Sequence, residues 1–119
     1  MATLSTHLLN SLDGTHLSDV NVALVEISYN GDRKIIANQK TDSGGRISLE
    51  FHPIISDNIA HEVIVSIPNS FYCLDHEEQN QKNVQVRTVS VGIKFEKANG
   101  SYHVPFILSP YGFSSWVSR

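Results

Sequence analysis

The feature that most constrains this chain is a period of two in its apolar residues. Apolar and polar side chains alternate over 20–29, 61–67 and 84–96, and the last of these runs is the longest. Successive side chains of a strand point to opposite faces, so such alternation indicates strands that bury one face. The sequence shows no heptads, internal repeats or low-complexity tracts. These observations predict an all-β protein.

Turn signals separate the alternating runs. Asn30-Gly31 and Asn99-Gly100 predict tight turns, because both residue types tolerate positive φ. The four residues Asp42-Ser43-Gly44-Gly45 predict a further turn, which is followed by a strand over 46–51. Strands at regular spacing with turns between them favour a two-sheet sandwich. The polar stretch 74–83 lacks β-branched residues, and we expect a short surface helix or loop there.

The composition excludes some classes of function. A length of 119 residues fits a single domain spanning 1–119. Lys and Arg form no cluster and the net charge is -3, so we expect no nucleic-acid partner. The longest apolar runs are too short to cross a bilayer, and no signal peptide is visible. A single cysteine, Cys73, excludes an internal disulfide framework, so we expect a cytoplasmic protein without a membrane partner.

Each end of the chain places one histidine inside a short apolar run with strand character. His7 lies in the run 4–10, and His103 lies in the run 102–108. An imidazole held on a strand can carry protons near neutral pH. Two of them from opposite ends of the chain suggest a site that the fold assembles. Each could instead be a structural imidazole that bonds a backbone carbonyl.

Arg46 begins the strand that follows the predicted turn. A guanidinium is always charged, and its planar fork matches carboxylate-like or ureide groups. Arg46 is therefore a candidate anion clamp, although a solvated arginine at a strand end is the other interpretation. Pro105 lies within the last apolar run, and because proline cannot donate to a ladder it predicts an edge strand or a bulge there.

The two ends of the chain also resemble a known family. The matching segments are Leu4-Ser5-Thr6-His7-Leu8-Leu9-Asn10 and Tyr102-His103-Val104-Pro105-Phe106-Ile107-Leu108-Ser109-Pro110-Tyr111-Gly112-Phe113-Ser114-Ser115. They resemble the first and last strands of the 5-hydroxyisourate hydrolases, the enzyme branch of the transthyretin-like proteins. The turn 41–46 fits as well, and the resemblance runs from about residue 3 to 115. It implies a two-sheet sandwich of about eight strands with one short helix, a homotetramer built as a dimer of dimers, and an enzyme without metal or cofactor.

The resemblance assigns roles to three residues. The family's hydrolases carry two histidines and an arginine at the positions of His7, His103 and Arg46, whereas transthyretin, the hormone carrier, lacks all three. These enzymes open the ring of 5-hydroxyisourate, an anionic oxidised purine, at an amide-like C–N bond. The resemblance thus implies that His7 and His103 position and activate water, and that Arg46 binds the anionic ring and stabilises developing charge. Ser5 lies on the face of His7 and could orient it.

The C-terminal segment departs from the family pattern. The family ends in Ser-Thr-Tyr-Arg-Gly-Ser, whose last four residues reach into the site, whereas this chain ends in Ser114-Ser115-Trp116-Val117-Ser118-Arg119. We expect Ser114, Trp116 and Arg119 to bind substrate together with Arg46, although Arg119 could instead be a solvated terminus. Ser101 also stands where the family usually has a histidine. Because polar groups at the rim of a site set specificity, these changes favour a shifted substrate.

The remaining histidines show no metal-ligand spacing with one another or with Cys73, so no metal site is expected among His16, His52, His61 and His76. Alternative functions stay open. The chain could be a 5-hydroxyisourate hydrolase, or an enzyme of the same fold retuned for another cyclic amide-like substrate or a ring rearrangement in a biosynthetic pathway. It could also carry a small aromatic ligand without chemistry, or be a purely structural sandwich.

Overall fold

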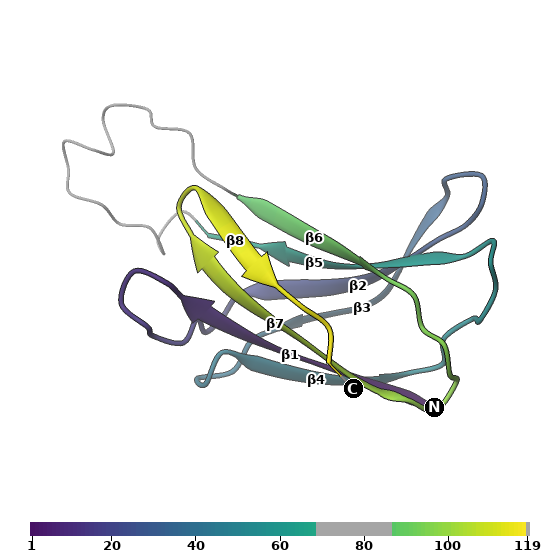
Figure 1. Cartoon of the computed structure of the whole chain (residues 1–119), viewed down its shortest axis with the longest axis horizontal. Helices are drawn as coiled ribbons and strands as arrows, with labels where there is room; N and C mark the ends of the chain where they lie inside the picture. The colour runs from purple at the N-terminus through teal and green to yellow at the C-terminus, as the bar shows by residue number, and fades with distance from the viewer. Residues whose placement is uncertain (69–86, 119) are drawn as a thin grey trace.

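Two four-stranded sheets pack face to face in the computed structural model, which describes residues 1–68 and 87–118 (Figure 1). The strands of this part of the chain are β1 (Ala2–Asn10), β2 (Asn21–Ile27), β3 (Arg33–Lys40), β4 (Arg46–Phe51), β5 (Ala60–Ser66), β6 (Thr88–Ile93), β7 (Ser101–Ser109) and β8 (Gly112–Ser115). One sheet has the order β4-β1-β7-β8 and the other the order β3-β2-β5-β6. The predicted all-β sandwich is confirmed.

The core lies between the two sheets because alternating residues of their strands bury one face. Along β1, the even-numbered residues are buried and the odd-numbered ones are half-buried. The inner faces of both sheets contribute to one apolar cluster, as in other sandwiches. Its fully buried side chains include Leu4, Leu8, Leu24, Val63, Val65, Val104, Phe106 and Leu108. The opposite face of β1 carries polar side chains at Ser5 and His7.

β1 lies inside its sheet and joins the two ends of the chain. It pairs antiparallel with β4 and parallel with β7, from Thr3 opposite Ser101 to Asn10 opposite Leu108. A parallel pair needs a long crossover connection, and here the connection contains most of the other strands. The first and last long strands therefore lie side by side (Figure 1).

The predicted turns and runs are found where the sequence indicated them. Gly31 and Gly45 both adopt positive φ, at 91° and 72°. The run 61–67 matches β5 to within one residue at each end, and the run 84–96 contains β6, although residues 84–86 lie outside the described residues. The expected helix over 74–83 also lies outside them. Residues 1–68 and 87–118 contain no helix, and thus none long and apolar enough to cross a membrane.

The expectation of an edge strand or a bulge at Pro105 is wrong, because β7 is an interior strand between β1 and β8. The sheet accommodates the missing N–H through a gap in pairing. The β7–β8 ladder ends at the pair Phe106 and Ser115, and pairing resumes only at the bridge between His103 and Ser118. Pro105 falls in this gap, where its carbonyl accepts a hydrogen bond from Ser115 Oγ at 2.8 Å.

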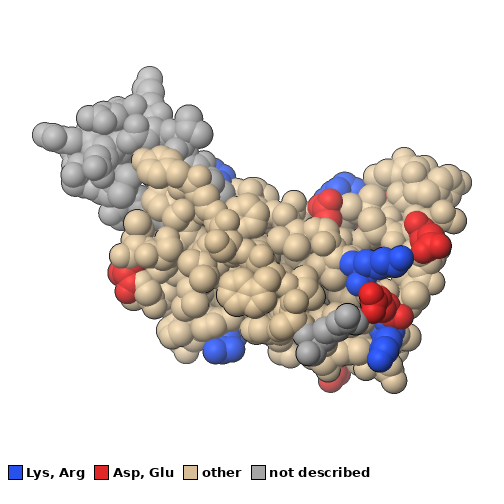
Figure 2. Space-filling model, viewed as in Figure 1, with Lys and Arg blue, Asp and Glu red and all other residues tan. Residues whose placement is uncertain are grey.

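Strands β1, β7 and β8 lie toward the viewer in Figure 1, and Figure 2 shows the side chains on the same face. Among the described residues, the middle of this face carries no Lys, Arg, Asp or Glu, and the charged side chains lie around its margins and toward one end. The face therefore has no broad patch of one charge. Any electrostatic binding on this face must come from individual residues.

Candidate functional site

The outer face of β4, β1 and β7 brings together the three residues predicted from the sequence as a site. His7 of β1 is directly opposite Arg46 of β4, and Ser5 of β1 is directly opposite His103 of β7. All four positions alternate with core residues, so their side chains point away from the core. His7 and His103 are half-buried and Arg46 is exposed. Two imidazoles and a guanidinium thus share one surface.

Arg46 is positioned by the turn that precedes β4. The Asp42 carboxylate accepts hydrogen bonds from the backbone N–H groups of Gly44 at 2.9 Å and Arg46 at 3.0 Å. Gly45 has a φ of 72°, and a Cβ there would come within 2.7 Å of the Leu8 carbonyl oxygen. The Gly45 carbonyl in turn accepts a hydrogen bond from the Leu8 N–H at 2.8 Å. A side chain at position 45 would strain this backbone, so Gly45 sets how β4 begins against β1.

His103 is held by Ser5. The Oγ of Ser5 lies 2.8 Å from Nδ1 of His103. The expectation that Ser5 orients His7 is therefore wrong. The parallel register places Ser5 opposite His103, while His7 lies two residues further along β1, which is about 6.6 Å in a strand. The bond occupies Nδ1 of His103 and leaves Nε2 for a substrate or a water molecule.

A further residue, His16, joins this face, and the sequence-based prediction did not include it. Its Nδ1 lies 2.8 Å from Nε2 of His7, and the two rings stack with centroids 4.9 Å apart and planes at 25°. The turn after β1 returns the chain so that His16 forms a bridge with Leu9. The signal in the sequence was Asp13-Gly14, a turn pair that sends His16 back beside β1. Within the described residues, no cluster of three or more His, Cys, Asp or Glu could hold a metal ion.

The pKa of His7 lies below its ordinary value of 6.5. Burial is the largest cause, followed by the Arg46 guanidinium and then by His16, with a smaller effect from His103. Backbone hydrogen bonding with Gly44 raises the pKa but does not reverse the shift. His7 is therefore neutral at physiological pH, which is the form that accepts a proton.

The C-terminal segment follows β7 into this face. The His103 N–H donates to the Ser118 carbonyl at 2.8 Å, and the Ser118 N–H donates to the His103 carbonyl at 2.9 Å. This bridge keeps the offset of the β7–β8 ladder, so Trp116 lies opposite Pro105. Pro105 is itself opposite His7 in the β1–β7 pair. The structure thus brings Trp116 to the neighbourhood of both histidines.

The other two expected rim residues are not placed at the histidines. Ser114 is opposite Ile107 of β7, and Ile107 lies four residues from His103 along that strand, or about 13 Å. Arg119 lies outside the described residues. Of the residues expected at the rim, Trp116 is the one that the register brings to the site.

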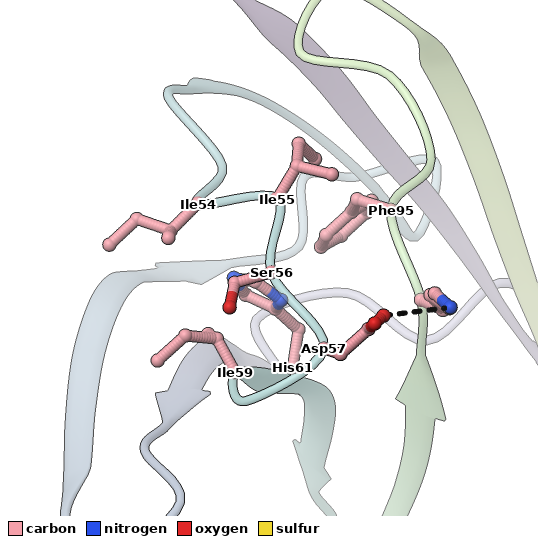
Figure 3. Close-up of a pocket in the computed structure, with 8 residues that line it drawn as sticks. Ile54, Ile55, Ser56, Asp57, Ile59, His61 and Phe95 are labelled. Atoms are coloured by element: carbon pink, nitrogen blue, oxygen red, sulfur yellow. Dashed lines mark ion pairs between the residues drawn. The ribbon is translucent and has the colours of Figure 1, made fainter.

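A second histidine environment lies beneath the loop between β4 and β5 (Figure 3). A hollow of about 210 Å³ there is lined by Ile54, Ile55, Ser56, Asp57, Ile59, His61, Lys94 and Phe95. His61 is 3% exposed and packs edge-on against Phe95, with ring centroids 4.9 Å apart. Its Nε2 is fully buried and finds no hydrogen-bond partner in the described part of the chain. Nε2 of His61 is therefore not accessible to a ligand in the hollow.

The fold and this face define a β-sandwich with a histidine- and arginine-bearing sheet, and comparison with known proteins identifies its family. The sequence profile of the HIUase/Transthyretin family matches residues 4–117. This chain belongs to that family. The 5-hydroxyisourate hydrolase of Halalkalibacterium halodurans is 24% identical over 115 residues, which cover 95% of this chain and 94% of that protein.

Solved structures share the fold. The 5-hydroxyisourate hydrolase of Klebsiella pneumoniae matches with a TM-score of 0.69 at 21% identity, covering 100% of both chains. Transthyretin from Sparus aurata matches with a TM-score of 0.68 at 20% identity, covering 97% of this chain and 95% of that one. At these identities the likeness concerns the fold. The resemblance stated from the sequence and the transthyretin-like sandwich are both confirmed.

Proposed function

We propose that this protein is a hydrolase that opens the ring of 5-hydroxyisourate by attack of water. One observation carries the proposal: β1, β4 and β7 place His7, Arg46 and His103 on one sheet face. Two proton carriers beside a fixed cation meet the needs of hydrolysing a cyclic amide-like bond in an anionic ring. The bacterial relatives named 5-hydroxyisourate hydrolase support the same reaction.

Each residue would supply one part of the chemistry. Arg46 would hold the anionic ring and stabilise the charge that builds on the attacked carbonyl oxygen. The imidazoles of His7 and His103 would jointly position and activate the water, which loses a proton to the site as its oxygen bonds to the carbonyl carbon. When the C–N bond breaks, that proton passes to the leaving nitrogen. The protein ends the cycle unchanged, with one water consumed.

The decisive experiment measures the decay of freshly generated 5-hydroxyisourate with and without the protein. We expect the wild-type protein to accelerate decay, and His103→Ala and Arg46→Ala each to slow turnover by about 100-fold or more. No acceleration by the wild-type protein would refute the proposed reaction. Acceleration that survives both substitutions would refute the residue roles and leave the reaction standing.

We also propose that the chain forms one domain over 1–119 and assembles in the cytoplasm as a homotetramer, a dimer of dimers. Strand β8 is an edge of its sheet, and its hairpin exposes 64% of Tyr111 and 45% of Phe113. An exposed apolar edge strand favours pairing with a second copy across a two-fold axis. Light scattering should give the mass of four chains, and a monomer would contradict the assembly.

The C-terminal segment favours a second candidate, an enzyme of the same fold that acts on another cyclic amide-like substrate or rearranges a ring in a biosynthetic pathway. The offset of the β7–β8 ladder puts Trp116 opposite Pro105 on the strand that carries His103, and an indole offers a flat face but only a donor. Turnover of a related lactam, with none of 5-hydroxyisourate, would establish this candidate. Tight binding of a small aromatic molecule without turnover would instead indicate a carrier.

A further inference from the structure

The contact between His16 and His7 limits the charge that the two rings can share. Their nitrogens are 2.8 Å apart, and a hydrogen bond at that distance needs one N–H group and one lone pair. Both nitrogens cannot carry a proton while the bond lasts. The two rings therefore form a dyad that holds at most one positive charge while the bond lasts.

The surroundings decide which ring carries that charge. His7 is half-buried and lies opposite Arg46 on β4, so both burial and a fixed cation oppose a charge on it. His103 on β7 also acts on His7 in the same direction. His16 is exposed, so water can solvate its charge. Among the described residues, no carboxylate forms an ion pair with either ring.

The tautomers follow from where the pair can hold a charge. Burial and the Arg46 guanidinium oppose a charge on His7, so the charge of a protonated pair lies on His16, with both nitrogens of that ring protonated. Because Nε2 of His7 faces Nδ1 of His16, His16 then donates from Nδ1, and neutral His7 carries its own proton on Nδ1. With the same bond kept, the neutral pair has the lone pair of His16 on its Nε2.

We propose that His16 is a catalytic residue of this site and that its Nε2 takes the proton from water, while His7 accepts the other N–H of His16 and orients the ring. The assignment rests on the proposed function and names His16 as the base of the His7–His16 pair. The O–H bond of water breaks as its oxygen bonds to the carbonyl carbon, and the proton goes to Nε2 of His16. The same proton passes to the ring nitrogen of the substrate when the C–N bond breaks. In between, the bond from His16 to neutral His7 is charge-assisted and therefore stronger.

Two substitutions separate the base from its partner. His16→Asn keeps an N–H group near the place of Nδ1 but removes the basic nitrogen. His7→Gln keeps an acceptor oxygen near the place of Nε2. With 5-hydroxyisourate as substrate, we expect His16→Asn to lower kcat by about 100-fold or more with KM within about threefold, and His7→Gln to lower kcat by less than about tenfold. His52→Asn, which changes an exposed histidine outside the site, should leave both constants unchanged.

The order of the two effects decides the outcome. Losses that are equal, or larger for His7→Gln, would overturn the assignment, because His7 would then be the base or an equal partner. Circular dichroism and thermal midpoints identify any variant that fails to fold. If one of these variants does not fold, the pH profile of kcat/KM is compared between the wild-type protein and His16→Gln instead. An acidic limb of the profile that is the same in both proteins would also overturn the proposal.

Nitrogen-15 NMR of the imidazoles tests the dyad without any turnover. At neutral pH we expect both rings to carry their proton on Nδ1 and to leave Nε2 unprotonated. A proton on Nε2 of His7, or a tautomer of His16 that His7→Ala leaves unchanged, would overturn the proposal. Absence of activity on 5-hydroxyisourate in a protein with the expected tautomers would refute the proposed function and leave the dyad intact.

Discussion

His7 and His61 both lie on strands, and for both histidines burial is the largest cause of a pKa below 6.5. Their partners differ. His7 is on an outer sheet face, bonded to His16 and opposite Arg46. His61 is 3% exposed, and its Nε2 is 3.9 Å from Glu26 Oε2, too far for a hydrogen bond. A lowered pKa of a histidine therefore does not by itself identify a functional site. The His7 region differs from the His61 region because its ring nitrogens have defined hydrogen-bond partners on an accessible face.

The largest effect is expected from removing the guanidinium that lies opposite His7. Arg46→Ala should lower kcat/KM for 5-hydroxyisourate by about 100-fold or more, because developing charge loses its stabilising group. Arg33→Ala is the matched control, because Arg33 also begins a strand. Its guanidinium pairs with the Glu62 carboxylate at 3.1 Å on the surface. Its effect on rate should stay within about twofold. Similar losses in both variants would remove the distinction.

The His7 region also depends on a strained turn, which the His61 region does not. Gly45→Ala should lower the free energy of unfolding by about 1–3 kcal/mol, because the residue has positive φ and its Cβ would press on the Leu8 carbonyl. Turnover should fall as well, since Arg46 follows directly. Gly44→Ala is the control, because a Cβ there meets only Asp42 Oδ1 at 3.4 Å. Urea denaturation measures both, and equal stabilities would contradict the role of the turn.

Replacing the buried histidine should affect neither rate nor stability strongly. His61→Leu keeps an apolar side chain of similar size against Phe95 and removes a buried nitrogen without a partner among the described residues. We expect kcat/KM within about twofold of wild type, and a change of less than about 1.5 kcal/mol in the free energy of unfolding. A large loss of turnover in this variant would place His61 in the chemistry and break the comparison.

The smallest effect is the pH dependence of stability. Because the folded pKa of His61 lies below 6.5, the unfolded chain binds more protons once the pH falls below that value. The free energy of unfolding should therefore decrease from about pH 6.5 downward and level off below the folded pKa. His61→Leu should flatten this slope and leave the pH dependence of stability above about pH 7.5 unaffected. Denaturation at a series of pH values measures it, and an unchanged slope would contradict the shift.

The sequence predicted the sheets well because burial of one strand face is a local property that alternation records directly. It also predicted that His7, Arg46 and His103 share a surface, through the family resemblance. The sequence did not predict the side-chain contacts that depend on which strands are neighbours. Ser5 meets His103 through the β1–β7 register, and His16 meets His7 through the return of the chain at Gly14. A period of two carries no information about which strand lies next to which.

The parallel pairing of β1 with β7 has a consequence for protein synthesis. The hydrogen bond between Ser5 and His103 joins residues 98 apart in the chain, so a ribosome must translate as far as residue 103 before this contact can form. Contacts of such long range are also the slowest to close during folding. A nascent chain still held in the exit tunnel would have β1 but no neighbour on that side. Formation of the bond between Ser5 and His103 would thus report that translation has passed β7 and that this strand has folded onto β1.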